Sequence, residues 1–91
     1  MTTAIVLIEA ERDALTTLGG ALADLDGVAE AYSVTGEWDF VAIVRVARHE
    51  RLAEVITGQL VKLPGVTRTQ TMVAFEVFSE HDLEAMFSIG Q

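Results

Sequence analysis

Two short stretches of the chain are apolar at nearly every position. Residues Phe40 to Val46 contain one charged side chain, Arg45, and residues Ala4 to Ile8 contain none. Successive residues of a strand point to opposite faces of a sheet, so a run that is apolar at both parities is typical of a strand covered on both sides. We therefore predict two central strands here.

Two longer stretches place apolar residues three and four positions apart, as an amphipathic helix does. They predict helices over roughly residues 11 to 24 and 49 to 62. The first contains Gly19 and Gly20, which weaken a helix. The second lacks a Ser, Thr, Asp or Asn at the expected cap, so we expect its first turn to be less well held.

The rest of the pattern predicts two further strands, an edge strand over 28 to 33 and a long strand over 66 to 78. The motif L-x-x-L-x-G-V occurs at residues 22 to 28 and again at residues 60 to 66. Each copy is typical of a helix end, a glycine turn and a strand start. The chain therefore reads β-α-β twice.

Two such units predict an α+β, ferredoxin-like βαββαβ fold. Its four-stranded antiparallel sheet carries both helices on one face, with the first and third strands central. The other face then needs a partner, so we expect a homo-oligomer built from sheet-on-sheet dimers, a dimeric α/β barrel. The domain is predicted over residues 1 to 78, and residues 79 to 91 are predicted to form an arm at a subunit interface.

Composition narrows the class of protein. The chain has 91 residues, 51% of them apolar, no cysteine and a formal net charge of −8. Scattered basic residues and this charge argue against direct binding to nucleic acid or to an anionic membrane. The first apolar run is too short for a signal or a membrane span, so we expect a cytoplasmic protein.

No enzyme signature is found. His49 and His81 stand at predicted helix starts among charged residues, without the spacing of a metal site or a catalytic triad. Carboxylates cluster near element ends, where solubility and helix electrostatics explain them. We expect a non-enzymatic protein without a cofactor and without a metal.

The turn before the central strand is the first candidate site. Gly36 permits a positive φ, and Trp38 and Asp39 follow it directly before the apolar run. A covered Asp39 needs hydrogen-bond donors or a cationic ligand group. An Asp that pairs with its own turn amides is the structural alternative.

A row of hydroxyl side chains on the last long strand is the second candidate. Thr67, Thr69 and Thr71 share one parity of that strand. They predict donors and acceptors beside a pocket suited to a small zwitterion, although β-propensity alone also explains a threonine ladder.

These motifs resemble a known family. Leu-Pro-Gly-Val at 63 to 66 precedes the Thr-rich strand, and Thr-Gly-Glu-Trp-Asp-Phe-Val-Ala occupies 35 to 42. Over about residues 3 to 78 the chain resembles the effector-binding domain of the leucine-responsive/asparagine-responsive (Lrp/AsnC) transcriptional regulators.

The resemblance implies a function and a site. It implies dimers that assemble further, often to octamers, and that hold a small effector, typically an amino acid, between dimers. Gly36, Trp38 and Asp39 would then form the turn side of the ligand site, and Thr69 and Thr71 the strand side. Members usually have Tyr where this chain has Trp38, so the pocket and ligand are expected to differ.

The chain begins on its first strand, where full-length regulators carry a DNA-binding helix-turn-helix. It therefore resembles a stand-alone effector-binding domain, which would affect transcription by co-assembling with a full-length relative. Two alternatives share the topology. One is a small dimeric α/β-barrel enzyme of the antibiotic-biosynthesis monooxygenase type, and the other is an oligomerisation module related to ACT domains.

Overall fold

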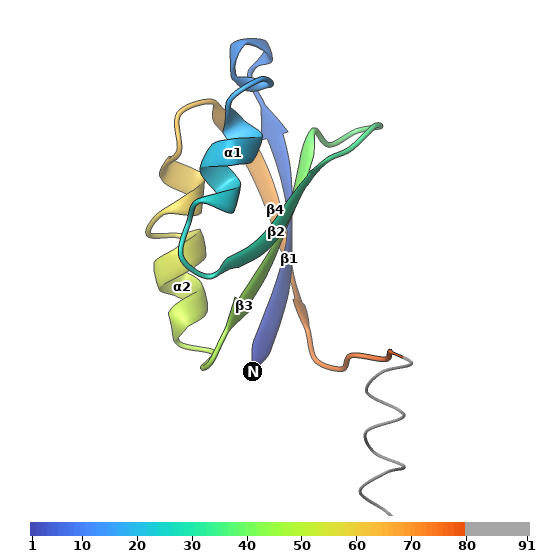
Figure 1. The fold of residues 1–91 in the computed structure, drawn as a ribbon, viewed down its shortest axis with the longest axis vertical. Coiled ribbons are helices and arrows are strands. Elements are labelled where there is room, and N and C mark those ends of the chain that lie inside the picture. The colour runs from blue at the N-terminus through green and yellow to red at the C-terminus, as the bar shows by residue number, and fades with distance from the viewer. Residues whose placement is uncertain (80–91) are drawn as a thin grey trace, which may run out of the picture.

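The chain folds as one antiparallel sheet with a layer of helices on one side (Figure 1). The computed structural model describes residues 1–79. In chain order the elements are β1 (Thr2–Ala10), η1 (Arg12–Ala14), α1 (Leu18–Ala23), β2 (Val28–Ser33), β3 (Phe40–Val46), α2 (Arg51–Ile56), η2 (Leu60–Lys62) and β4 (Val66–Ala74), where η marks a 3-10 helix. The predicted arm lies outside the described residues, except for Ser79.

The sheet order is β2-β3-β1-β4, and all neighbours are antiparallel. The two apolar runs form β1 and β3, the central strands, as the sequence predicts. Both copies of the repeated motif form the predicted glycine turn before a strand, because Gly27 and Gly65 have φ values of 101° and 97° directly before β2 and β4. The predicted ferredoxin-like arrangement is confirmed.

The predicted helices are wrong in their continuity. Each is a short α-helix with a separate 3-10 turn, so that residues 11 to 24 and 49 to 62 are not single helices. In the first, β-branched Thr16 and Thr17 and two glycines lower helix propensity. In the second, Gly58 donates its N–H to the oxygen of Ala53 at 2.9 Å, which ends the regular helical pattern. Glu50 precedes α2 and makes no side-chain cap.

The predicted last strand is too long. Strand β4 ends at Ala74 rather than Phe78, because Thr3 is the last β1 residue that pairs with it. Beyond that pair no strand in the described part of the chain lies beside it, and Phe75 and Phe78 are 93% and 80% exposed.

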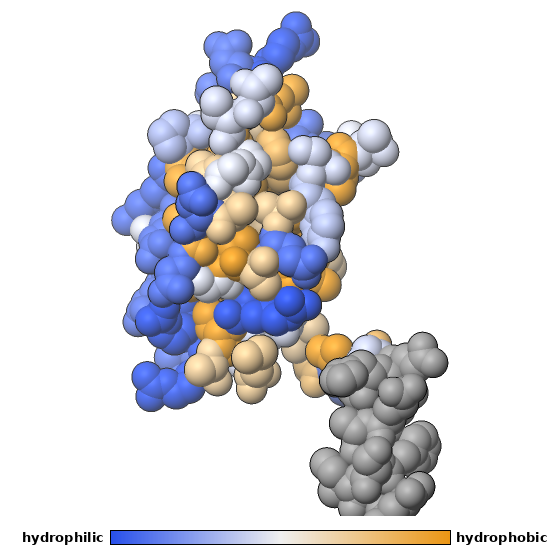
Figure 2. Space-filling view, viewed as in Figure 1, coloured by the Kyte–Doolittle hydropathy of each residue, from blue (hydrophilic) through white to orange (hydrophobic). Residues whose placement is uncertain are grey.

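The core lies between the helices and one face of the sheet. Its members are apolar and almost completely buried: Ala4, Val6, Ile8, Leu18, Leu22, Phe40, Ala42, Val44, Val46, Leu52, Val55, Ile56 and Leu60. Gly19 lets α1 approach the sheet closely, because an added Cβ would stand 3.2 Å from the Phe40 ring. Hydrophilic residues cover the outer side of the helical layer (Figure 2).

Within residues 1–79, the other sheet face carries no helix. We call it the open face and define it by the strand residues of opposite parity to the core. Its larger apolar members are Ile5, Leu7, Tyr32, Val41, Ile43 and Met72. The four on β1 and β3 are partly buried, whereas Tyr32 and Met72 are 48% and 42% exposed. The helices of one chain therefore cover one face only, as the sequence predicts.

Candidate functional site

The turn between β2 and β3 is built by backbone hydrogen bonds at its base. Val34 donates its N–H to the oxygen of Asp39 at 3.0 Å, and Asp39 donates its own N–H to the oxygen of Ile8 at 2.9 Å. Gly36 has a φ of 107°, and no atom lies within 4 Å of the place where its Cβ would stand. The backbone conformation, and not crowding, therefore favours glycine at this position.

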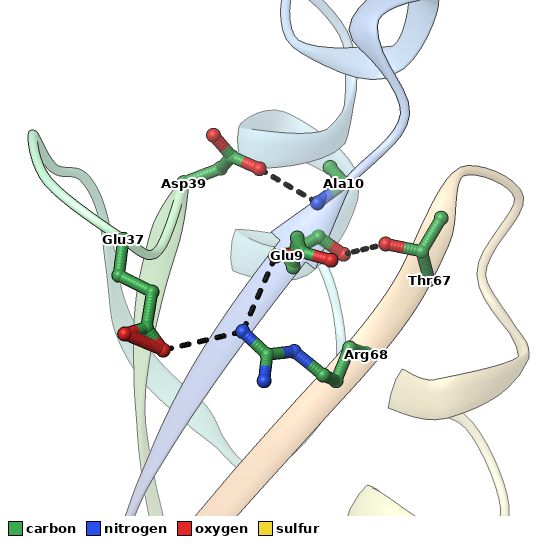
Figure 3. Close-up of polar contacts among 6 residues, drawn as sticks. All are labelled: Glu9, Ala10, Glu37, Asp39, Thr67 and Arg68. Carbon is green, nitrogen blue, oxygen red and sulfur yellow. Dashed lines mark hydrogen bonds and ion pairs between the residues drawn. The ribbon is translucent and has the colours of Figure 1, made fainter.

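Asp39 joins this turn to the central strand β1. Its Oδ2 accepts a hydrogen bond from the N–H of Ala10 at 2.8 Å, beside a register shift in the β1–β4 pairing (Figure 3). The observed partner is thus an amide of another strand rather than of the turn itself. Figure 3 also shows the second carboxylate oxygen pointing away from Ala10, so this oxygen takes no part in the hydrogen bond.

Trp38 lies against an arginine that the sequence patterns do not single out. The Arg68 guanidinium carbon is 4.3 Å from the centroid of the Trp38 ring. Arg68 Nη2 lies 3.3 Å from Glu9 Oε2 and 3.2 Å from Glu37 Oε2 (Figure 3). We call Glu9, Glu37, Trp38 and Arg68 the arginine corner. These contacts link the turn to both β1 and β4.

The sequence offers one signal for this corner. Arg68 is the only basic residue in the stretch that forms β4, and Glu9 is the acid that ends the apolar run of β1. Their pairing depends on the register of β1 against β4, which places Glu9 opposite Arg68. Register is a long-range property, so the periodicity of either strand alone does not predict the contact.

The two threonines point to the other side of the sheet. Thr69 pairs with Ile8 and Thr71 pairs with Val6, and both partners belong to the core under the helices. Directly paired residues of an antiparallel sheet point to the same face. Thr71 accordingly lines a hollow of about 270 Å³ with α2 residues that include Ile56, and with Thr57. One chain therefore does not bring the threonine pair and Trp38 together.

A larger hollow lies against the open face, at the end away from the turn. It has a volume of about 710 Å³, and its lining includes Ile5, Ile43, Arg45 and Val77. The hollow joins the apolar centre of the open face to the segment that leaves β4.

Tyr32 and Glu30 add a polar pair to the open face on β2. The Tyr32 hydroxyl donates a hydrogen bond to Glu30 Oε2, and this bond, with burial and the nearby negative charge, raises the pKa of Tyr32. Arg45 Nη1 lies 3.6 Å from Glu30 Oε1. Within residues 1–79 no group of three or more His, Asp or Glu side chains is arranged to hold a metal ion. No helix in this range is long and apolar enough to cross a bilayer.

The fold and the turn together define a class of protein. It is the class of small ferredoxin-like domains with one open sheet face and a glycine turn carrying an acid at the end of a central strand. The family description "Lrp/AsnC ligand binding domain" matches residues 3–83. The chain therefore belongs to the Lrp/AsnC ligand-binding domain family, as the motifs predict.

Relatives and solved structures agree with this assignment. An HTH-type transcriptional regulator of Pyrococcus furiosus is 37% identical over 82 residues, covering 87% of this chain and 55% of the relative. The chain thus spans about half the length of the curated relatives it matches. A crystal structure from Thermus thermophilus has 45% identity and a TM-score of 0.82, covering 88% of this chain and all of that one.

A more distant structure shows the fold alone. A Neisseria meningitidis transcriptional regulator, solved as a complex with L-Met, has a TM-score of 0.76 at 15% identity. The match covers 87% of this chain and 53% of that one.

Proposed function

We propose that this chain is a non-enzymatic domain that binds a small amino acid and assembles with copies of itself. The observation that carries the proposal is the turn at the end of the open face, where Asp39 holds one backbone amide and directs its second oxygen elsewhere. A carboxylate in this position suits the ammonium group of a zwitterion. The complex of the Neisseria regulator with L-Met supports an amino acid as the ligand class.

Self-assembly is supported by the open face. Removing apolar side chains at the centre of a sheet from water is favourable, and the helices formed by residues 1–79 do not reach this side. A second copy placed sheet against sheet covers the same residues on both chains, which is the arrangement of a two-fold dimer. We propose that such dimers assemble further into a ring, an octamer or a similar closed oligomer.

The two halves of the proposed ligand site are joined by this assembly. Gly36, Trp38 and Asp39 form the turn side, and Thr69 and Thr71 form the strand side on the opposite sheet face. A ligand that contacts both sets therefore lies between subunits, where the turn of one chain meets β4 of another.

The family supports a regulatory role. We propose that the domain acts in the cytoplasm and affects transcription through a full-length relative that carries the DNA-binding part, without contacting DNA itself. The relatives in three Pyrococcus species are transcriptional regulators, which supports this role.

A thermal-shift screen with the twenty amino acids, paired with light scattering, tests the proposal. Ligand that binds the folded state alone stabilises it by about 2.7 kcal/mol at a hundredfold excess over Kd. The expected result is an oligomer and a concentration-dependent rise in Tm with a subset of amino acids. A monomer at micromolar concentration, or a flat response to all twenty, would contradict the proposal.

A further inference from the structure

The arginine corner contains a guanidinium with donor capacity to spare. An arginine side chain has five N–H donors and no acceptor. Both ion pairs of Arg68 described above use the same nitrogen, Nη2. Figure 3 shows the other terminal nitrogen, Nη1, directed away from both glutamates. The N–H groups of Nη1 therefore donate to neither glutamate.

The corner also holds this guanidinium in place. Trp38 lies against it at 4.3 Å, and the two glutamates come from different segments, β1 and the turn. A cation stacked on an aromatic ring and paired from two sides has lost much of its rotamer freedom before any ligand arrives. Because the Arg68 side chain is still 52% exposed in a single chain, its own fold leaves room beside it for a small molecule. The site is thus preorganised for an anionic group.

The charges around the corner suit a zwitterion better than a simple anion. Arg68 contributes one positive charge, whereas Glu9, Glu37 and nearby Asp39 contribute three negative charges. A dianion would be repelled by this excess of carboxylates. A molecule with one carboxylate and one ammonium group satisfies both signs.

We propose that Arg68 binds the carboxylate of the effector through Nη1, while Trp38, Glu9 and Glu37 hold the guanidinium in position. This inference rests on the proposed amino-acid-binding function. It adds the residue whose contact requires the ligand to have a free carboxylate. The carboxylate of Asp39 then binds the ammonium group of the effector. Arg68 is a specificity-determining residue, because an amide or amine analogue lacks the group that it binds.

The test compares each amino acid with its primary amide. The probes are the twenty L-amino acids and, for each one that binds, the corresponding L-amino acid amide. Trp38 is the only tryptophan in the chain, so its fluorescence reports binding at this corner without a label. Proteins to compare are the wild type, Arg68→Met, Arg68→Lys and the control Arg51→Met, which removes another partly exposed arginine, on the helical layer away from the open face.

The acid-to-amide affinity ratio is the deciding measurement. In the wild type and in R51M we expect the acid to bind about tenfold to a hundredfold more tightly than the amide, as a charge-assisted hydrogen bond predicts. In R68M the ratio falls to near one, and in R68K it is intermediate because the charge remains without the planar guanidinium. A general loosening of the turn would weaken acid and amide alike and would leave the ratio unchanged.

The outcomes separate the two proposals. If an amino acid binds and R68M keeps the wild-type ratio, the role of Arg68 is wrong while the binding function stands. If no amino acid changes the Trp38 fluorescence or the Tm of the wild type, the binding function is wrong and the role of Arg68 falls with it.

Discussion

Replacing Ile43 with glutamate should separate assembly from folding. Ile43 lies on the open face opposite Ile5 and is partly buried, whereas its neighbour Val44 is completely buried in the core. A charged side chain at position 43 therefore leaves the packing under the helices unchanged. It places a carboxylate where the proposed partner sheet would lie.

The expected effect on the dimer is large. Full burial of an isoleucine side chain contributes about 1.5–3 kcal/mol, and we take half of this because Ile43 is already partly covered within one chain. A two-fold dimer contains the side chain twice, so its loss costs about 1.5–3 kcal/mol, or about tenfold to a hundredfold in the dimer Kd. Burying two unpaired carboxylates adds to this. Ile43→Glu should be monomeric at concentrations where the wild type is not.

Light scattering after size-exclusion chromatography measures the change, with circular dichroism to verify the fold. The matched control is Val44→Ala, which removes two methyl groups from the core next to Ile43. This control should lower the free energy of unfolding by roughly 1–2 kcal/mol and leave the contact surface unchanged. An Ile43→Glu protein with wild-type mass and a wild-type fold would refute the assignment of the open face as the interface.

Three further results follow from the geometry. Asp39→Asn should keep the hydrogen bond to the Ala10 N–H and lose ligand binding, whereas Asp39→Ala should also lower the free energy of unfolding by about 1–2 kcal/mol; urea unfolding and the thermal-shift screen distinguish the two variants. Gly65→Ala should lower the free energy of unfolding more than Gly36→Ala does. Both glycines have positive φ, but a Cβ at 65 would stand 2.3 Å from the Cβ of Ala14, while the space at 36 is empty. Equal losses of unfolding free energy in urea would contradict this. The pKa of Tyr32 is raised in the folded chain, so the protonated hydroxyl stabilises the fold. This stabilisation is fully present below about pH 10 and is lost as the pH rises through the higher pKa of the folded state. Tyr32→Phe should flatten this dependence of the unfolding free energy on pH, and an identical pH profile in both proteins would refute it.

Local patterns predicted the parts of the fold that depend on local physics. The apolar runs of β1 and β3 identified the central strands, because a strand buried by neighbours on both sides needs apolar residues at both parities. The repeated glycine turn placed the starts of β2 and β4, since positive φ favours glycine. The break in the second predicted helix was not foreseen, because the amphipathic pattern persists through residues 57 to 59, where the backbone leaves the helix.

The candidate site was harder to predict, for a reason visible in β4. Parity along the strand groups Thr67, Thr69 and Thr71, but it does not say which sheet face they share. The register against β1 decides this, because Thr69 and Thr71 lie opposite core residues. The same register brings Arg68 to the open face beside Trp38. A shift of one residue would exchange the two sets.

In the proposed function, this division of one strand between two faces links ligand binding to assembly. If the turn and Arg68 act on the open side and the threonine pair acts on the helical side, no single chain contacts a small ligand with both sets. The free energy of binding to the second set is then gained only when another subunit supplies those residues. By thermodynamic linkage, any factor by which assembly raises ligand affinity is the factor by which the ligand strengthens assembly. In the proposed assembly, a domain of this size gains a regulated oligomeric state from its sheet geometry, because the edge strand β4 presents different chemistry to each side.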